Sequence, residues 1–269
     1  MTLNDTITVE ARGPIEILSL NRPASLNALN PAMVQALNAY LAELHERPEV
    51  RVVILRAEGR AFCAGLDIKE SRGGDRATNE TRVLSAWRTQ TAIGNVYRKM
   101  RSAPQPFIAL GQGAACGGGF SLLLASDVRF GAPSLRMNAA YIKIGLSGCD
   151  MGSSYFLPRL VGASLAAELI LTGRFINAER ALRLGLLSEV VEEDKLLETG
   201  LSLAEEMLLT SPNGLRMSKH ALGLNIDAPS LDAAMAIEDR QQALLSGTRD
   251  AAEAMTAFLE KRPPFYSGS

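Results

Sequence analysis

The segment AACGGGFSLLLASD, residues 114–127, places three consecutive glycines directly before an apolar stretch with the composition of a helix. Glycine costs roughly 0.5–1 kcal/mol relative to alanine in a helix, so three of them in the first turn forgo about 2–3 kcal/mol. A strand, a glycine turn and a helix start bring unpaired backbone N–H groups beside the positive end of a helix dipole. Such a turn can hold a phosphate, a carboxylate or an oxyanion. Close packing of the helix against a strand is the alternative explanation for the glycines.

The chain on both sides of this turn alternates between strand and helix patterns. Alternation at 7–12 and 15–21 around Gly13-Pro14 predicts a hairpin, and Asn30-Pro31 predicts the start of a helix. Short apolar runs predict strands at 52–55, 107–110, 128–131 and 190–191. Helical spacing predicts helices from 31 to 44 and over 82–100, 120–125, 150–161, 163–172, 178–184, 193–210 and 230–261.

Polarity and periodicity also predict how the chain is organised. Apolar residues recur at helical spacing within 82–100, through Val83, Trp87, Val96 and Met100. The polar segment 70–81 predicts a mobile loop. Strands give way to helices at about residue 195, so we expect a core over 1–194 and a helical C-terminal region over 195–269.

Composition limits the classes of protein to which the chain can belong. Its 269 residues are 47% hydrophobic and 5% aromatic, which is typical of a helix-rich α/β protein with a full-sized core. A net charge of −1 without a basic tract indicates neither a nucleic acid nor an anionic membrane as partner. Apolar runs fall short of the ~20 residues that span a bilayer, and the first residues do not resemble a signal peptide. Three cysteines without a CxxC pair, and only two histidines, favour a reducing cytoplasm and disfavour a metal site.

A second glycine-containing segment, RAFCAGLDIKE at 60–70, also follows a predicted strand. It carries Gly65 and small residues before Asp67. If each of the two glycine turns directs one backbone N–H at the same oxygen atom, they form an oxyanion hole.

A dinucleotide-binding fold is one alternative, because Gly111-Gln112-Gly113 with Gly117 is similar to its glycine fingerprint. That fingerprint normally follows the first strand of its domain, whereas here about a hundred residues precede it. The chain also has no acidic residue closing a following strand at the expected distance and no Tyr-x-x-x-Lys pair. These features disfavour an oxidoreductase.

Four blocks of the sequence resemble the enoyl-CoA hydratase/isomerase (crotonase) family, in that family's order. They are NRPASLNAL at 21–29, GRAFCAGLDIKE at 59–70, CGGGFSLLLASD at 116–127 and LTGRFINAERALRLGLLSEVV at 171–191. The resemblance covers residues 5–262. It implies an α/β fold, a crotonase-type spiral of ββα units with a C-terminal helical trimerisation region, assembled as a homotrimer or as a hexamer of paired trimers.

The resemblance also implies an acyl-CoA thioester substrate and no separate cofactor, since CoA is part of that substrate. It places the oxyanion donors at the backbone N–H groups of Leu66 and Gly118. It further places several residues along the CoA moiety: Ala64, Asp67, Ile68, Lys69 and Lys261.

Two positions depart from the pattern of the family's hydratases, which carry glutamates where this chain has Ser121 and Tyr141. Adding water across a conjugated double bond needs one group to deprotonate water and another to protonate the α-carbon, and paired carboxylates suit that work. Serine and tyrosine have pKa values far above 7 and are poor bases without strong activation. The usual two-glutamate hydration is therefore not expected.

One carboxylate remains in the corresponding loop, Asp150 in SGCDMGSS. Dienoyl-CoA isomerases of the family have a similar Asp-x-Gly segment that supplies a catalytic aspartate, although the match needs one inserted residue. Asp150 is therefore a candidate acid/base for double-bond isomerisation, hydration or C–C hydrolysis. The alternative role for Asp150 is the N-cap of the helix predicted at 150–161. For the whole chain, the alternative is a CoA-ester-binding protein without catalytic activity.

Overall fold

A six-stranded sheet forms the centre of the computed structural model, which describes residues 5–71 and 81–269. Its strands are ordered β1-β2-β3-β4-β6-β9, and each adjacent pair is parallel except β1 and β2, which form the predicted hairpin. Their bounds are β1 (Ile7–Arg12), β2 (Ile15–Leu20), β3 (Val52–Ala57), β4 (Phe107–Gly111), β6 (Val128–Gly131) and β9 (Glu189–Val190). Parallel strands end at the same edge, so the segments that follow β3 and β4 start side by side.

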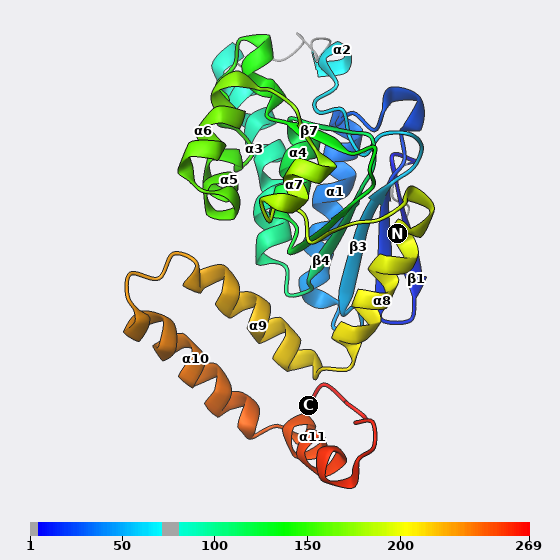
Figure 1. Cartoon of the computed structure of the whole chain (residues 1–269), viewed down its shortest axis with the longest axis vertical. Coiled ribbons are helices and arrows are strands. Elements are labelled where there is room, and N and C mark those ends of the chain that lie inside the picture. Colours follow the sequence, from blue (N-terminus) through cyan, green and yellow to red (C-terminus); the bar gives the residue numbers. More distant parts are fainter. Residues whose placement is uncertain (1–4, 72–80) are drawn as a thin grey trace.

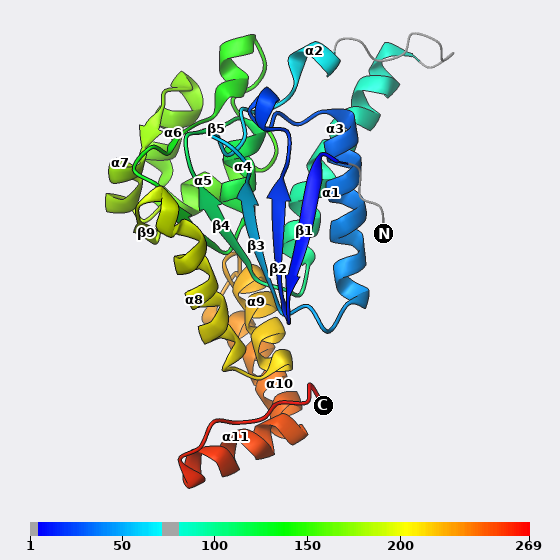
Figure 2. The same ribbon diagram turned by 90° about the vertical axis from the view of Figure 1, so that its right-hand side faces the viewer.

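A second, small sheet continues from that edge and consists of β5 (Ala114–Cys116), β7 (Arg136–Asn138) and β8 (Ile176–Asn177). Strands of two or three residues are too short for a periodicity signal, so none of the three was predicted from the sequence. A strand of the large sheet, a strand of the small sheet and a helical turn follow one another twice. The first set is β4, β5 and α4 (Gly118–Ala125), and the second is β6, β7 and the 3₁₀ turn η3 (Ala140–Ile144). This is the expected spiral of strand pairs and helices (Figure 2).

Helices cover both faces of the large sheet, because its central strands alternate between two apolar clusters. Leu18, Val53 and Leu55 belong to the cluster formed with α1 (Pro31–Glu43), α3 (Arg82–Ser102) and α4 (Gly118–Ala125). Ile17 and Ile54 face the opposite cluster, where α8 (Leu196–Leu208) packs against β3 and β4.

The start of α1 confirms the predicted helix signal. The Asn30 side chain accepts a hydrogen bond from the Met33 N–H at 2.9 Å, and Pro31 occupies the first turn, where no N–H is needed. Leu37 and Tyr40 continue the buried face of the helix.

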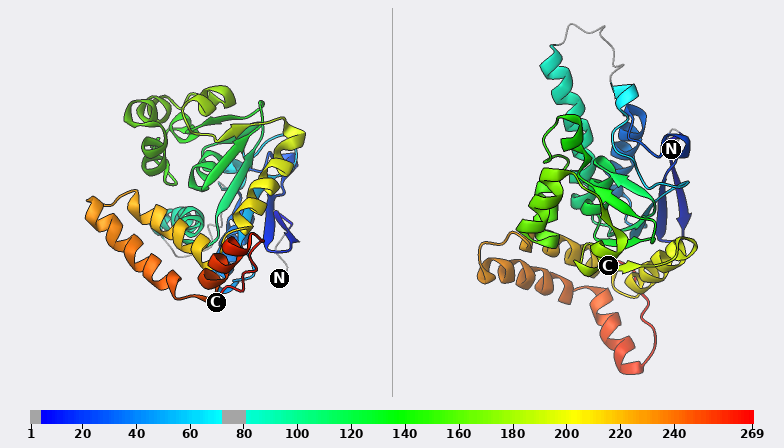
Figure 3. Two further views of the ribbon diagram at one scale, coloured as in Figure 1. Left: turned by 60° about the horizontal axis from the view of Figure 1, so that its bottom comes forward. Right: turned by 45° about the horizontal axis from the view of Figure 1, so that its top comes forward.

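The first part of α3 lies outside the core. Val96 and Met100 are buried, but Val83 and Trp87 are 77% and 73% exposed although they share the helical spacing. Figure 3 shows the reason, because this end of α3 extends beyond the layer that contains α1 and α4. The predicted loop at 70–81 falls mainly on residues 72–80, which lie outside the described residues.

The three helices after α8, which are α9, α10 and α11 (residues 212–260), extend away from the sheet at the bottom of Figure 1, and we call them the arm. The single helix predicted at 230–261 is wrong, because Gly247 separates α10 from α11 and the Thr248 side chain caps α11 through the Ala251 N–H. Sequence inspection missed α9, although Ser211-Pro212 provides its cap and first residue. The remaining helices are α2 (Ile68–Ser71), α5 (Ser153–Val161), α6 (Ala163–Thr172), α7 (Ala178–Arg183), α9 (Pro212–Asn225), α10 (Leu231–Ser246) and α11 (Arg249–Glu260). Short 3₁₀ turns are η1 (Pro23–Ser25), η2 (Leu44–Glu46), η3 (Ala140–Ile144) and η4 (Glu193–Lys195).

The arm is anchored to the core through Lys219 of α9. Its buried ammonium group donates to the carbonyl oxygens of Met100 and Gln105, at 3.0 and 2.7 Å, and lies 3.0 Å from the Asp127 carboxylate. None of the helices in residues 5–71 and 81–269 combines the length and apolar character needed to cross a bilayer.

Candidate active site

The three glycines of the opening segment form the turn between β5 and α4. Gly117 has φ +50° and precedes the helix, and Gly118 and Gly119 form its first turn. A Cβ on Gly119 would lie only 2.2 Å from the carbonyl oxygen of Cys63. Close packing therefore explains the glycine at position 119, because the backbone at Cys63 occupies the space that a side chain would need.

The second glycine turn, at Gly65, lies directly against the first. Gly65 has φ +98°, and a Cβ there would be 2.9 Å from the Cys116 carbonyl oxygen and 3.9 Å from the Gly118 nitrogen. The backbone of Leu29 fixes both neighbours of Leu66. The Leu29 N–H donates to the Gly65 carbonyl at 2.7 Å, and the Leu29 carbonyl accepts from the Asp67 N–H at 2.9 Å.

Both candidate oxyanion donors are left unpaired by this arrangement. Within residues 5–71 and 81–269, neither the Leu66 N–H nor the Gly118 N–H donates to another group of the protein. For Gly118 this follows from its place in the first turn of α4, where N–H groups have no partner inside the helix. Two free N–H groups on adjoining turns are what an oxyanion hole requires.

An arginine clamp holds the Leu66 segment to the chain before α1. Arg22 donates two hydrogen bonds to Asp67, both at 3.1 Å, and one to Glu70 at 2.7 Å, while Asn30 also donates to Glu70. Burial opposes ionisation of Asp67, but hydrogen bonds from the Glu70 N–H and from Arg22 outweigh it and lower the pKa of that carboxyl. The Asp67 side chain is thus engaged in the protein's own structure.

The other predicted CoA contacts are spread over the molecule. Ala64 is half-buried beside the Gly65 turn, and Ile68 and Lys69 are exposed on α2. Lys261 ends α11, which lies at the opposite end of the molecule from α2 in Figures 1 and 2. One chain alone does not bring Lys261 to the glycine turns.

Ser121 and Tyr141 meet behind the first glycine turn. Their hydroxyl oxygens are 2.6 Å apart, and both side chains are almost fully buried. Burial raises the pKa of the Tyr141 phenol, and the charge of Asp150 raises it further, while the hydrogen bond with Ser121 opposes the shift only in part. The pair is therefore neutral and unsuited to act as a base.

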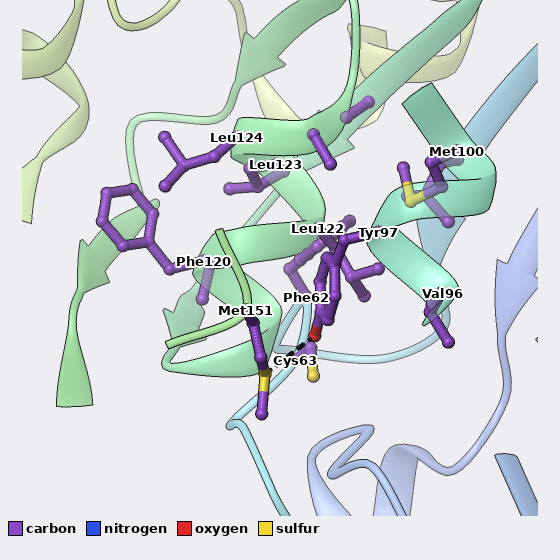
Figure 4. Packing of buried hydrophobic residues seen from close by; sticks show 14 of the residues in the cluster. Phe62, Cys63, Val96, Tyr97, Met100, Phe120, Leu122, Leu123, Leu124 and Met151 are labelled. Carbon is purple, nitrogen blue, oxygen red and sulfur yellow. Dashed lines mark hydrogen bonds between the residues drawn. The ribbon is translucent and has the colours of Figure 1, made fainter. Parts of the chain in front are cut away.

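Tyr97 of α3 is a site residue that sequence reasoning missed. Its hydroxyl donates to the Gly118 carbonyl at 3.0 Å and lies 3.1 Å from the sulfur of Met151 (Figure 4). Burial raises the pKa of Tyr97 well above its usual range, so the hydroxyl stays protonated. In the sequence Tyr97 belongs to the helical pattern of α3, and nothing there distinguishes it from an ordinary core tyrosine.

Asp150 lies beside this cluster but does not cap the helix that follows. The N-cap of α5 is Gly152, so the capping alternative is wrong. One oxygen of the Asp150 carboxylate, Oδ1, accepts from the Met151 N–H at 2.7 Å and from the Gln90 side chain. The sulfur of the adjacent Met151 lies 3.1 Å from the Tyr97 hydroxyl, and the negative charge of Asp150 contributes to the raised pKa values of Tyr97 and Tyr141.

The cysteines near the glycine turns are unreactive in this setting. Burial raises the pKa of the Cys63 thiol to about 12 and also raises the pKa of Cys116, so neither is a thiolate near neutral pH. Among the described residues, no group of three or more His, Cys, Asp and Glu side chains could hold a metal ion.

A cavity of about 460 Å³ opens between α1 and α3 and reaches Leu66. Val34, Ala92 and Ile93 form part of its apolar wall. A cavity of about 490 Å³ lies at the α5–α6 turn and α7, but it includes neither glycine turn. Of these two cavities, the first is the one lined by a candidate donor residue, Leu66.

Comparison with known proteins gives a consistent result over nearly the whole chain. The sequence model described as enoyl-CoA hydratase/isomerase matches residues 10–269. The protein named Probable enoyl-CoA hydratase echA12 of Mycobacterium leprae is 36% identical over 264 residues, covering 97% of this chain and 90% of the relative. The Short-chain-enoyl-CoA hydratase of Clostridium acetobutylicum is 33% identical and covers 97% of each chain.

Solved structures agree in fold. The crystal structure of enoyl-CoA hydratase from Bacillus anthracis superimposes with a TM-score of 0.91 at 33% identity, covering 98% of this chain and all of that one. The structural similarity therefore extends over nearly the whole chain.

Proposed function

The chain belongs to the enoyl-CoA hydratase/isomerase family, and we propose that it stabilises the enolate of an acyl-CoA thioester and moves a proton with Asp150. The observation that carries this proposal is the pairing of two backbone N–H groups, on Leu66 and Gly118, with the Asp150 carboxylate. Among the described residues neither N–H group has an acceptor, and one oxygen of the carboxylate has no donor. An acyl-CoA substrate is what members of this family act on.

The two N–H groups supply the electrostatic part of catalysis. The thioester carbonyl oxygen accepts both, and its negative charge grows as the enolate forms, so the hydrogen bonds strengthen in the transition state. Each such donor contributes about 3–4 kcal/mol to stabilisation of a transition state. The N–H groups cannot move a proton, so the reaction also needs an acid or base.

Asp150 meets that need, because Ser121 and Tyr141 are neutral and bonded to each other. In double-bond isomerisation, the carboxylate takes a proton from one carbon of the acyl group, and the electrons of that C–H bond enter the enolate. The same carboxyl then returns the proton to another carbon and the double bond moves. Atoms and electrons balance without a cofactor beyond the CoA of the substrate.

Hydration and C–C hydrolysis are related uses of the same groups. In either, Asp150 would deprotonate a water molecule that attacks the substrate, and the oxyanion hole would hold the resulting charge. Isomerisation needs only one carboxylate, whereas hydration commonly uses two, so a single Asp150 favours isomerisation.

A second candidate is a CoA-ester-binding protein without catalytic activity. The buried Ser121–Tyr141 pair favours it, because by resemblance these positions carry the two glutamates of hydratases. The left-handed backbone at Met151, with φ +49°, directly after Asp150 favours the enzyme instead, because such conformations cluster at functional sites.

We also propose assembly into a trimer or a hexamer through the C-terminal arm. The arm exposes large apolar side chains that water disfavours. Those more than 70% exposed are Leu222, Leu231, Met255, Phe258, Leu259 and Phe265. The three free cysteines support a reducing compartment such as the cytoplasm.

The test is Asp150→Asn, assayed with 2-enoyl-, 3-enoyl-, 3,5-dienoyl- and 3-oxoacyl-CoA thioesters and product mass spectrometry. The amide oxygen can still accept from Met151 and Gln90, so the melting temperature should hardly change. Turnover of the thioester on which the wild-type enzyme is most active should fall by about 10²–10⁴.

Asp232→Asn, the same change at an exposed position of α10, is the matched control and should retain full activity. A wild-type rate for Asp150→Asn would show that the proton carrier is elsewhere. If the wild-type protein binds these thioesters and converts none of them, the non-catalytic alternative gains support.

A further inference from the structure

The direction of the Asp150 carboxylate depends on a side chain from a distant part of the sequence. Gln90, on the exposed part of α3, donates its amide N–H to Oδ1 of Asp150, 60 residues later in the chain. The Met151 N–H donates to the same oxygen at 2.7 Å.

The two donors leave the carboxylate oxygens in different states. Oδ1 holds two hydrogen bonds, whereas Oδ2 accepts none from residues 5–71 and 81–269. An oxygen that already accepts two N–H groups is a poor proton acceptor, so Oδ2 is the one that remains free for substrate.

The geometry around Met151 supports a fixed carboxylate. Met151 has φ +49°, a left-handed conformation that residues with a side chain seldom adopt. At this residue the N–H donates to Oδ1 of Asp150, and the sulfur lies 3.1 Å from the Tyr97 hydroxyl.

The same helix braces both parts of the site. Gln90 and Tyr97 are seven residues apart, two helical turns, and therefore lie on one face of α3. Tyr97 holds the Gly118 carbonyl of the oxyanion turn, and Gln90 holds Asp150. The helix thus sets the position of the proton carrier relative to the oxyanion hole.

A glutamine suits this task chemically. Its amide donates to the carboxylate without carrying a charge, so it does not form an ion pair that would hold the proton carrier permanently ionised. Asp150 contributes to the raised pKa values of the Tyr97 and Tyr141 phenols, and both phenols stay neutral near pH 7.

We propose that Gln90 is a positioning residue that holds Oδ1 of Asp150 so that the proton is carried on Oδ2. This inference rests on the proposed role of Asp150. It assigns a catalytic consequence to an exposed side chain that does not itself touch the reacting atoms.

The experiment compares Gln90→Leu, which removes the donor, with Gln90→Glu, which keeps the length of the side chain. With the most active thioester of the panel, kcat should fall by about 10–100-fold in both variants while KM changes far less. Losing a donor to the ionised form raises the pKa of a carboxyl, so the acidic limb of the pH–rate profile should move to higher pH. The shift should be larger in Gln90→Glu, which adds a like charge. A ¹³C NMR titration of the Asp150 carboxyl measures the same change without substrate.

Gln242→Leu, the same substitution on exposed α10, controls for a general effect and should change none of these readouts. Rates and titration like those of the wild type in both Gln90 variants would overturn the proposal. If Asp150→Asn is inactive in that case, only the role of Gln90 fails. If Asp150→Asn is fully active, the proposed function itself fails.

Discussion

Replacing Gly119 by alanine sets local helix propensity against tertiary packing. Propensity predicts that this change in the first turn of α4 stabilises the protein by about 0.5–1 kcal/mol. In the folded structure, the added Cβ would lie 2.2 Å from the Cys63 carbonyl oxygen and 2.6 Å from the Cys63 Cβ. These contacts are far inside van der Waals distance, and the obstructing carbonyl is backbone, which cannot rotate away.

The cost follows from what has to move. Inserting a methyl group into a packed region costs about 1–3 kcal/mol. Displacing the Cys63 carbonyl also weakens its 2.9 Å hydrogen bond from the Cys116 N–H, which adds about 1 kcal/mol. After subtracting the gain in propensity, the free energy of unfolding should fall by about 1–3.5 kcal/mol.

The same displacement should impair catalysis, because the Cys63 segment leads to the Leu66 donor. A misplacement of about 1 Å between the two N–H groups should lower kcat/KM by about 100-fold. Urea denaturation followed by circular dichroism measures stability, and acyl-CoA turnover measures the second effect.

Gly223→Ala is the control, since a Cβ there has only the Arg101 side chain nearby, at 3.7 Å. Within α9 this variant should be stabilised by about 0.5–1 kcal/mol and should stay active. Should Gly119→Ala unfold at the same or higher urea concentration than the wild type, the packing argument would be refuted.

Two further predictions concern the C-terminal arm. Burial lowers the pKa of Lys219 to about 8 although Asp127 opposes the shift, so between about pH 8 and 10.5 the unfolded chain binds more protons than the folded one. The free energy of unfolding should therefore rise with pH across that range, by at most about 1.4 kcal/mol per pH unit. Urea titrations of Lys219→Met should not show this rise. The same dependence on pH in the wild type and in Lys219→Met would contradict the lowered pKa of Lys219. Light scattering of the wild type should give the mass of a trimer or hexamer of the 28.8 kDa chain. The double variant Phe258→Ser/Leu259→Ser should have a lower mass, because both side chains are exposed on the arm. A monomeric wild type would contradict assembly through the arm.

Features that depend on neighbouring residues were predictable from the sequence. The hairpin around Gly13-Pro14, the cap at Asn30 and the glycine turn before α4 each depend on residues within a few positions of one another. Periodicity also predicted α6 to the residue, because its ends are marked by Gly162 and Gly173. Together with the four blocks, such signals indicated the family, and the comparisons confirm it.

Local sequence patterns gave wrong predictions where the burial or the contacts of a side chain depend on an element that is remote in the sequence. Val83 and Trp87 fit the helical spacing of α3, but among the described residues no layer covers that part of the helix. Asp150 fits a capping position, yet its carboxylate turns to Gln90 and the Met151 N–H.

The relation between the two glycine turns also depended on tertiary structure. Gly65 and Gly118 are 53 positions apart, and they meet because β3 and β4 are parallel neighbours whose following segments leave the same edge of the sheet. The sequence by itself indicated two turns with accessible backbone, and it has Ser121 and Tyr141 where, by resemblance, hydratases carry glutamates. Only the folded chain decided that their N–H groups adjoin and that Gly119 is required by the Cys63 carbonyl, because distances between segments remote in sequence are set by strand pairing and packing.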